Sequence, residues 1–286
     1  MTTKNGILLL TIAMLFFAIE DTFIKLLTGR FSQWQIIAML GLGGSLVFGV
    51  FASLKGRINF RDILTSKVLF ARSIAEAAAA AAYVISLSKV DLLVTAAVFQ
   101  ATPLAITFGA AVFLKEDVGW RRWSAIIVGF IGVLIIIRPG LDGFQPASLW
   151  SLVAVAAVAA RDLLTRSIPS SIPSTSVAFF AFFTLMVIGG PLAISTGGFQ
   201  PLSGNSLVFV PLAVLFGTGG YYAIVAAMRS GDVSAIMPFR YTRLIFSIML
   251  GMLVFSESLD LMTVVGSFII IVTGLFTFWR ERIRQR

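Results

Sequence analysis

The sequence contains no cysteine and no histidine, and charged residues make up only 12% of its 286 positions. These absences exclude disulfides, thiolate and imidazole metal sites, Cys or Ser-His nucleophiles and histidine proton relays. The sequence also lacks a G-x-x-x-x-G-K-S/T phosphate-binding loop, so it has no such motif with which to drive ATP hydrolysis. We therefore expect no metal, no cofactor and no enzymatic activity. The competing hypothesis is an intramembrane enzyme acting on a lipid or an isoprenoid.

Apolar residues dominate the composition: 58% of positions are hydrophobic, and the mean hydropathy is +0.98. A helix needs roughly 20 apolar residues to cross a bilayer. This predicts an all-α integral membrane protein with ten transmembrane helices and a first span that is retained rather than cleaved. The expected spans are 6–28, 33–54, 66–88, 91–114, 119–138, 147–166, 175–197, 207–228, 231–254 and 260–280.

Basic residues are distributed unevenly between the two sides of these spans. Most of the 22 lysines and arginines lie on one side, including the loop 55–67 and the C-terminal tail. The positive-inside rule then predicts that both termini are cytoplasmic. Topology also accounts for the net charge of +9, so we expect no nucleic acid partner. The expected partners are the lipid bilayer and a small-molecule substrate, with a homodimer left open.

The chain resembles itself when it is shifted by 141 residues. Five spans fall in each half, and an odd number forces the second half to enter the membrane from the opposite side. This predicts an inverted repeat of residues 1–140 and 141–286. The shift aligns Asp21 with Asp162, Lys25 with Arg166, Asp91 with Asp232 and Glu116 with Glu257.

Several short motifs resemble the drug/metabolite transporter superfamily. They are AIEDTFIKLL at 18–27, Arg72 at the start of the third span, FLKE at 113–116 and FSE at 255–257. The resemblance implies an EamA-type fold of two inverted five-helix halves in the bacterial inner membrane. It further implies secondary transport of a small organic metabolite by alternating access, with an amino-acid or drug exporter as the alternative. A second likeness, to bacterial riboflavin transporters, is carried by AIEDTFIKLL, MLGLGG at 39–44 and PFRYTRLIFS at 238–247.

Charged residues within the spans are candidates for gating or coupling, because an intramembrane charge usually faces a cavity or a partner. Arg72 and Glu76 are four residues apart on one helix face, where an ion pair forms readily. For the other acids, helix-end solvation or a fixed ion pair is the alternative, whereas Lys25 and Arg166 are expected to extend to the interface. The candidates are Glu20, Asp21, Arg72, Glu76, Arg161 and Asp162.

The ninth span contains two arginines three residues apart, Arg240 and Arg243. Two buried guanidinium groups require carboxylates from other spans or an anionic or carbonyl-rich substrate. We expect at least one of them to bind substrate, and the alternative is an ion pair with Glu20, Asp21 or Glu76. Pro238 in the same span and Pro103 in the fourth span can each interrupt their helix.

All four tyrosines lie within spans rather than at their ends, although membrane tyrosines usually prefer the interface. This placement favours a polar cavity that binds a planar, polar or anionic substrate, and interhelical packing is the alternative. Together with Gln100 beside Pro103, the tyrosines complete the predicted substrate-binding residues. These are Tyr83, Gln100, Tyr221, Tyr222, Arg240, Tyr241 and Arg243.

Overall fold

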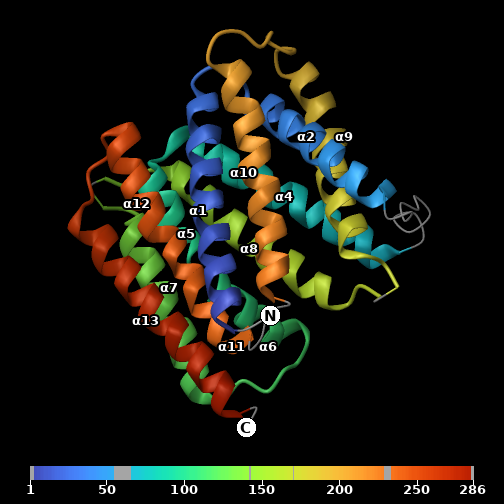
Figure 1. The fold of residues 1–286 in the computed structure, drawn as a ribbon. Helices are drawn as coiled ribbons and strands as arrows, with labels where there is room; N and C mark the ends of the chain where they lie inside the picture. The colour runs from blue at the N-terminus through green and yellow to red at the C-terminus, as the bar shows by residue number, and fades with distance from the viewer. Residues whose placement is uncertain (1–2, 55–65, 142, 170, 229–232, 285–286) are drawn as a thin grey trace.

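The computed structural model describes residues 3–54, 66–141, 143–169, 171–228 and 233–284. All regular structure in these residues is helical, and ten helical segments are long and apolar enough to cross a membrane (Figure 1). This confirms the expected all-α protein with ten spans. Both termini lie at the same end of the bundle (Figure 1). Most of the basic loop 55–67 and Asp232 lie outside the described residues.

The spans start and end close to the boundaries expected from the sequence. The first half contains α1 (Thr3–Thr28), α2 (Gln33–Leu54), α4 (Lys67–Lys89), α5 (Leu92–Phe99), α6 (Thr102–Phe113) and α7 (Trp120–Ile137). The second half contains η1 (Pro146–Ser148), α8 (Leu149–Arg166), α9 (Ser174–Ser195), α10 (Ser206–Met228), α11 (Val233–Ile236), η2 (Met237–Tyr241), α12 (Thr242–Phe255) and α13 (Leu261–Arg284).

The fourth and ninth spans are both interrupted. The fourth is divided into α5 and α6, and the ninth into α11, η2 and α12. Pro103 lies in the first turn of α6 and Pro238 in the first turn of η2, where the missing N–H cannot continue a preceding helix. Gln100 lies at the first interruption, and Tyr241, 141 residues later, lies at the second. Interrupted helices at corresponding positions of two repeats are the usual place for a transporter's binding site.

The helices pair in a pattern that the repeat maps onto itself. α1 packs along α10, while α8, the equivalent of α1, packs along α4, the equivalent of α10. α2 packs along α9, and α7 along α13, so each of these pairs joins a helix to its own equivalent. Because each half holds five spans, equivalent helices run through the bundle in opposite directions. The packing therefore fits two inverted repeats.

α7 and α13 approach most closely at two glycines. A Cβ atom at Gly132 would lie 2.9 Å from the carbonyl oxygen of Gly266, and a Cβ atom at Gly266 would lie 2.5 Å from the carbonyl oxygen of Gly132. Close approach of backbones at small residues is the main source of helix association in lipid, where apolar side chains gain little by leaving the solvent. The backbones of α7 and α13 thus lie against each other at this point, with Ile136 and Ile269 packed beside the two glycines.

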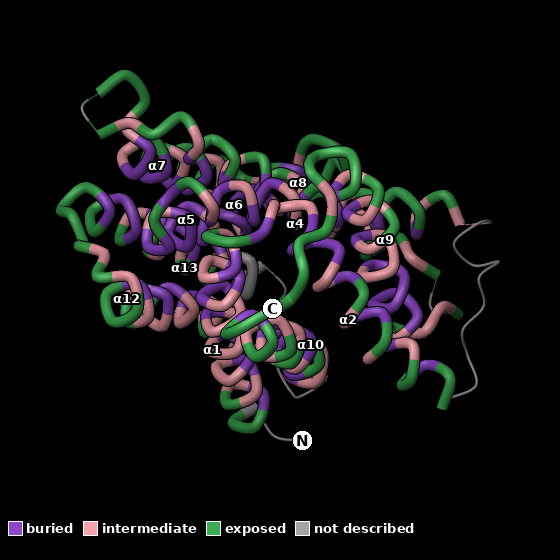
Figure 2. The backbone as a smooth tube through the Cα atoms, turned by 90° about the horizontal axis from the view of Figure 1, so that it is seen from above, coloured by how far each residue is buried: buried purple, intermediate pink, exposed green. Residues whose placement is uncertain are grey.

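Burial separates the inside of the bundle from its rim. Figure 2 shows buried segments facing other helices and exposed segments turned outward. Large apolar side chains remain exposed, among them Leu46, Leu215 and Phe268 at 61%, 61% and 67%. A bilayer accommodates such a surface because the helices satisfy their own backbone hydrogen bonds.

Candidate functional site

A buried ion pair joins the two halves of the chain. Asp21 on α1 is 2% exposed, and its two carboxylate oxygens accept hydrogen bonds from Arg243 on α12. The Nη2 atom of Arg243 lies 2.7 Å from Oδ2 and 2.9 Å from Oδ1 of Asp21. Tyr83 on α4 donates a hydrogen bond to Oδ2 at 2.9 Å. This charge-assisted network connects three helices, and neither charge could remain so buried without the other.

Three aromatic rings surround the guanidinium group of Arg243. Its central carbon lies 5.3 Å from the ring centre of Phe17, 5.5 Å from that of Tyr83 and 5.0 Å from that of Phe99. These are cation–π distances, and they add to the stabilisation given by Asp21. Protein groups thus occupy both the edge and the faces of this guanidinium. In this conformation Arg243 forms an ion pair with Asp21, which was the alternative to substrate binding for the arginines of the ninth span.

A second charged cluster lies between α4 and α8. Glu76 is 2.8 Å from Arg72 on its own helix and 2.9 Å from Arg161 on α8. Arg161 in turn lies 2.7 Å from Asp162. The predicted pair of Arg72 with Glu76 is therefore present, and it continues into a chain of alternating charges. Two cations and two anions make this cluster neutral, and Arg72 is only 3% exposed.

Glu20 lies beside Asp21 on α1 but has a different environment. No ion pair of Glu20 with another described residue occurs. Its carboxylate lies against Gly217 on α10, where an added Cβ atom would be 2.2 Å from Oε1. Since Glu20 and Gly217 are the repeat equivalents of Arg161 and Glu76, one half has an ion pair where the other has a carboxylate facing a glycine.

Three predicted binding residues lie at the interruptions of the fourth and ninth spans with polar groups that have no partner. The guanidinium group of Arg240 makes no hydrogen bond or ion pair with any other described residue. Gln100 and Tyr241 are 6% and 5% exposed. Within the described part of the chain, the Nε2 atom of Gln100 and the hydroxyl of Tyr241 have no hydrogen-bond partner. Buried polar groups without partners are costly, and a polar ligand could satisfy them.

The two remaining tyrosines are placed apart from these groups. Tyr221 packs edge-on against Phe48, with ring centres 5.4 Å apart, and more distantly against Phe182. Tyr222 on the same helix is 69% exposed. The structure therefore brings Asp21, Tyr83 and Arg243 together and leaves Tyr222 outside the buried networks.

Sequence reasoning missed the ion pair that Lys25 forms. Lys25 was expected to extend to the interface, but its side chain is 16% exposed and pairs with Glu257 at 2.8 Å. The expectation was wrong because α12 and the turn after it pack over the end of α1 and supply a carboxylate. The repeat offered a sequence signal for this pair, because Lys25 and Glu257 are the equivalents of Arg166 and Glu116. Those two residues also form an ion pair, at 3.0 Å.

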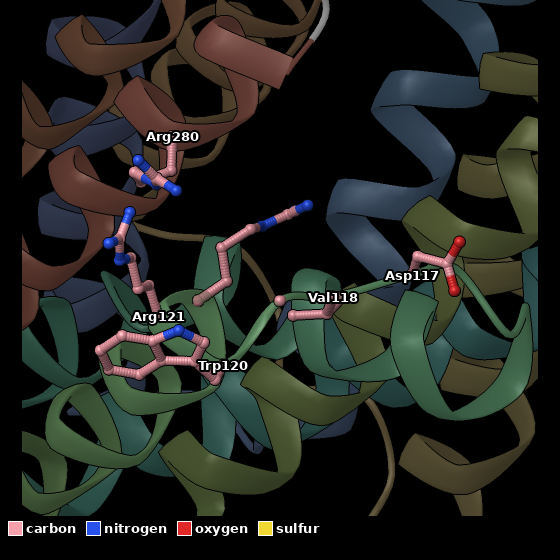
Figure 3. Close-up of a pocket in the computed structure, with 7 residues that line it drawn as sticks. Asp117, Val118, Trp120, Arg121 and Arg280 are labelled. Carbon is pink, nitrogen blue, oxygen red and sulfur yellow. The ribbon is translucent and has the colours of Figure 1, made fainter.

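A cavity of about 550 Å³ lies near the start of α7 and the end of α13 (Figure 3), and no residue of either charged cluster lines it. Arg121, Arg122 and Arg280 line it, and the Arg121 guanidinium lies 5.4 Å from the ring centre of Trp120. Figure 3 shows Arg121 and Arg280 near one another and Asp117 on the opposite side. None of the predicted site residues lines this cavity, so it does not coincide with the candidate site.

Known proteins similar to this chain are membrane transporters. The sequence model of the EamA-like transporter family matches residues 4–138 and 145–279. The S-adenosylmethionine uptake transporter of Rickettsia conorii is 28% identical over 182 residues, which cover 63% of this chain and 60% of that protein. The riboflavin transporter of Rhizobium johnstonii is 29% identical over 205 residues, which cover 72% of this chain and 68% of that protein.

The fold is also similar to that of a solved crystal structure. The TM-score is 0.64 at 17% identity, and the match covers 98% of this chain and 99% of the other. At this identity the likeness shows the fold alone. The family match spans both halves of the chain, and the relatives' names are those of transporters, not enzymes. The chain therefore belongs to the EamA-like transporter family of the drug/metabolite transporter superfamily.

Proposed function

We propose that this protein carries a small organic metabolite across the bacterial inner membrane by alternating access, with both termini in the cytoplasm. Residues 1–140 and 141–286 exchange conformations, so that a site between them opens first to one side and then to the other. The network of Asp21, Arg243 and Tyr83 supports this proposal best, because it buries charge where helices of both halves meet. Energy comes from an ion gradient or from the substrate's own gradient.

The substrate class is suggested by the groups that lack partners. Arg240 supplies a cation, and Gln100 and Tyr241 supply buried polar groups at the two interrupted spans. S-adenosylmethionine and riboflavin, the molecules named for the two relatives, each contain a planar nitrogen heterocycle. We propose a substrate with such a ring and an oxygen-rich or anionic group for Arg240. Tyr221 and Tyr222 remain candidates for ring contacts.

The acids and their partners divide into gating and coupling roles. Two ion pairs, Asp21 with Arg243 and Glu76 with Arg161, hold different helices together, and they must be rearranged for the halves to move. Arg72 and Asp162 extend the second pair along its own helices. Glu20 has no such pair with a described residue, so it can bind and release a proton without breaking a salt bridge. We propose Glu20 as the proton carrier if transport is proton-coupled.

Ligand-induced thermal stabilisation tests the binding proposal. The purified protein is heated with riboflavin, S-adenosylmethionine or an aromatic amino acid, since a ligand at 100 times its Kd stabilises by about 2.7 kcal/mol. Arg240→Ala should weaken binding by about tenfold or more, because a hydrogen bond to a charged group is lost. The control is Arg121→Ala in the cavity of Figure 3, which should bind as the wild type does. Unchanged binding by Arg240→Ala would contradict the assignment.

Cysteine labelling tests the orientation. The chain has no native cysteine, so Ser203→Cys and Ser66→Cys provide single reactive sites. An impermeant maleimide should label the first from outside intact cells and the second only after permeabilisation. Labelling of both from the same side would overturn the topology.

A further inference from the structure

Two ion pairs related by the repeat lie at opposite ends of the bundle. Lys25 at the end of α1 pairs with Glu257 after α12, and Arg166 at the end of α8 pairs with Glu116 after α6. Each residue of one pair lies 141 positions from its equivalent in the other. Each pair also joins the two halves of the chain. The two ion pairs are therefore equivalent contacts, one at each end of the bundle.

The backbone places the two acids in the same way. Lys115 and Ser256, which precede them, both have left-handed backbones, with φ of 54° and 53°. The amide of Glu116 then donates to the carbonyl of Ala110, and the amide of Glu257 donates to the carbonyl of Gly251, each at 3.2 Å. Both helices therefore end at a residue in the left-handed conformation, which is adopted here without glycine. Any difference between the two acids lies in what faces them.

At the end opposite the termini, Glu257 is fully engaged. Its two oxygens accept hydrogen bonds from the amides of Leu92 and Leu93 at 2.8 and 2.9 Å. These are unpaired amides at the start of α5, where the preceding Asp91 provides no side-chain cap. Lys25 completes the contact by donating to the carbonyl of Val90 at 2.8 Å. A carboxylate from the second half thus caps a helix of the first, and its side chain is only 5% exposed.

At the end with the termini, the equivalent pair is open to solvent. The side chains of Arg166 and Glu116 are 52% and 45% exposed. Within the described residues, the carboxylate of Glu116 accepts no backbone hydrogen bond. An exposed pair of this kind contributes little to stability. The helix equivalent to α5 starts at Val233, 141 residues after Leu92, and Glu116 does not cap it here.

We propose that Lys25 and Glu257 form a latch that closes the end opposite the termini, and that Arg166 and Glu116 form the same latch at the other end in the opposite conformation. There Glu116 caps the start of α11, while Glu257 is released from α5. This inference rests on the proposed alternating access. The latch also connects directly to the candidate site, because α5 carries Phe99 against Arg243, and α12 carries both Arg243 and the turn that places Glu257.

Distances between spin labels test the latch without any substrate. In the cysteine-free chain, Gly29→Cys with Leu259→Cys reports on the end opposite the termini, and Gly119→Cys with Ser167→Cys reports on the other. Glu257→Gln should increase the population with a long 29–259 distance and a short 119–167 distance by about tenfold, because charged hydrogen bonds are lost from one state only. Adding Glu116→Gln should return the populations toward those of the wild type, since both latches are then weakened.

Asp260→Asn is the matched control. It changes the same kind of residue three positions away, in a pair with Arg138 that has no equivalent among the four latch residues. Three results would overturn the latch. The distance populations could shift equally in Asp260→Asn and Glu257→Gln, they could stay unchanged in Glu257→Gln, or they could shift in the same direction in Glu116→Gln as in Glu257→Gln. If Glu257→Gln does not fold, Lys25→Met, which keeps the caps on α5, must show the shift. Failure of the proposed function would appear separately, as wild-type proteoliposomes that transport nothing.

Discussion

Asp21 and Asp162 occupy equivalent positions in the two halves, but their partners differ. Asp21 pairs with Arg243 in the other half of the chain, whereas Asp162 pairs with Arg161, the residue beside it. The equivalent of Arg243 in the first half is Thr102, which cannot serve as a counterion. The repeat therefore preserves the place of the acid in the backbone but not its counterion.

The same contrast applies to the helix pairs that contain these acids. Between α4 and α8, Glu76 bridges two arginines, while the equivalent place between α1 and α10 has Gly217 facing Glu20. One side is a neutral network of ion pairs, and the other keeps a carboxylate without a cation among the described residues. A symmetric backbone can thus support an asymmetric site, with fixed charges on one side and ionisable groups available on the other.

The largest expected difference is between Asp21→Asn and Asp162→Asn. Asp21→Asn leaves the buried guanidinium of Arg243 without a counterion and should cost about 3–5 kcal/mol of unfolding free energy. Asp162→Asn should cost about 1 kcal/mol or less, because Arg161 keeps Glu76 and the pair is partly exposed. Denaturation of the purified variants measures both. Asp21→Asn combined with Arg243→Gln should recover much of the loss, and equal losses in the two single variants would remove the contrast.

Gly217→Ala should have the next largest effect. The new methyl group would overlap the carboxylate of Glu20, and overpacking of this kind costs about 1–3 kcal/mol. Gly190→Ala on α9 is the control, since a Cβ atom there meets nothing within 4 Å. Melting temperatures should fall for the first variant only. If Glu20→Ala does not relieve the effect of Gly217→Ala, the contact with Glu20 is not its cause.

Tyr83→Phe should have a smaller effect on stability. It removes one hydrogen bond to Asp21 but keeps the ring against Arg243, so the cost should be about 1.5 kcal/mol. Tyr221→Phe is the comparison, because Tyr221 makes ring contacts but its hydroxyl makes no hydrogen bond to a described residue. Unfolding curves that are shifted equally for both would show that the Asp21 network does not depend on the tyrosine hydroxyl.

The smallest expected effect is that of pH on the loop pair at the end opposite the termini. Partial burial alone would raise the pKa of Asp260, but hydrogen bonds from Thr263 and Arg138 outweigh it and hold that pKa below its ordinary value of 3.8. A carboxyl group whose pKa is lowered by folding stabilises the fold at pH values above its pKa in the unfolded state. This stabilisation is lost as the pH falls through the pKa in the folded state. The difference in melting temperature between the wild type and Asp260→Asn should therefore shrink below about pH 4. A difference that does not change with pH would exclude ionisation as its cause.

Local patterns predicted the parts of the structure that depend on a single helix. The ten spans follow from hydropathy, the interruptions from Pro103 and Pro238, and the pair of Arg72 with Glu76 from their spacing. The sequence alone narrowed the partner of Arg243 to three acids, because the choice among them depends on which helices pack together. Asp21 is the partner since α1 lies along α12.

The sequence was less informative where a residue's environment comes from elsewhere in the chain. Lys25 at a helix end ordinarily reaches toward the interface, and only the packing of α12 changes that. Tyr222 lies within a span like the other tyrosines, but its position on the helix turns it outward. Both differences arise from tertiary packing. The side chain sets which contacts a residue can make, and the neighbouring helices determine which of these contacts it makes.

The glycine contact between α7 and α13 limits how the molecule can move. If one helix slid along the other, Gly132 and Gly266 would leave the point of contact, and larger side chains from the neighbouring turns would be forced against the facing backbone. This contact therefore fixes the register of α7 and α13, whereas rotation about the crossing point keeps the two glycines in contact. The fifth and tenth spans can therefore act as a pivot, while the charged helices on either side change their angle around it.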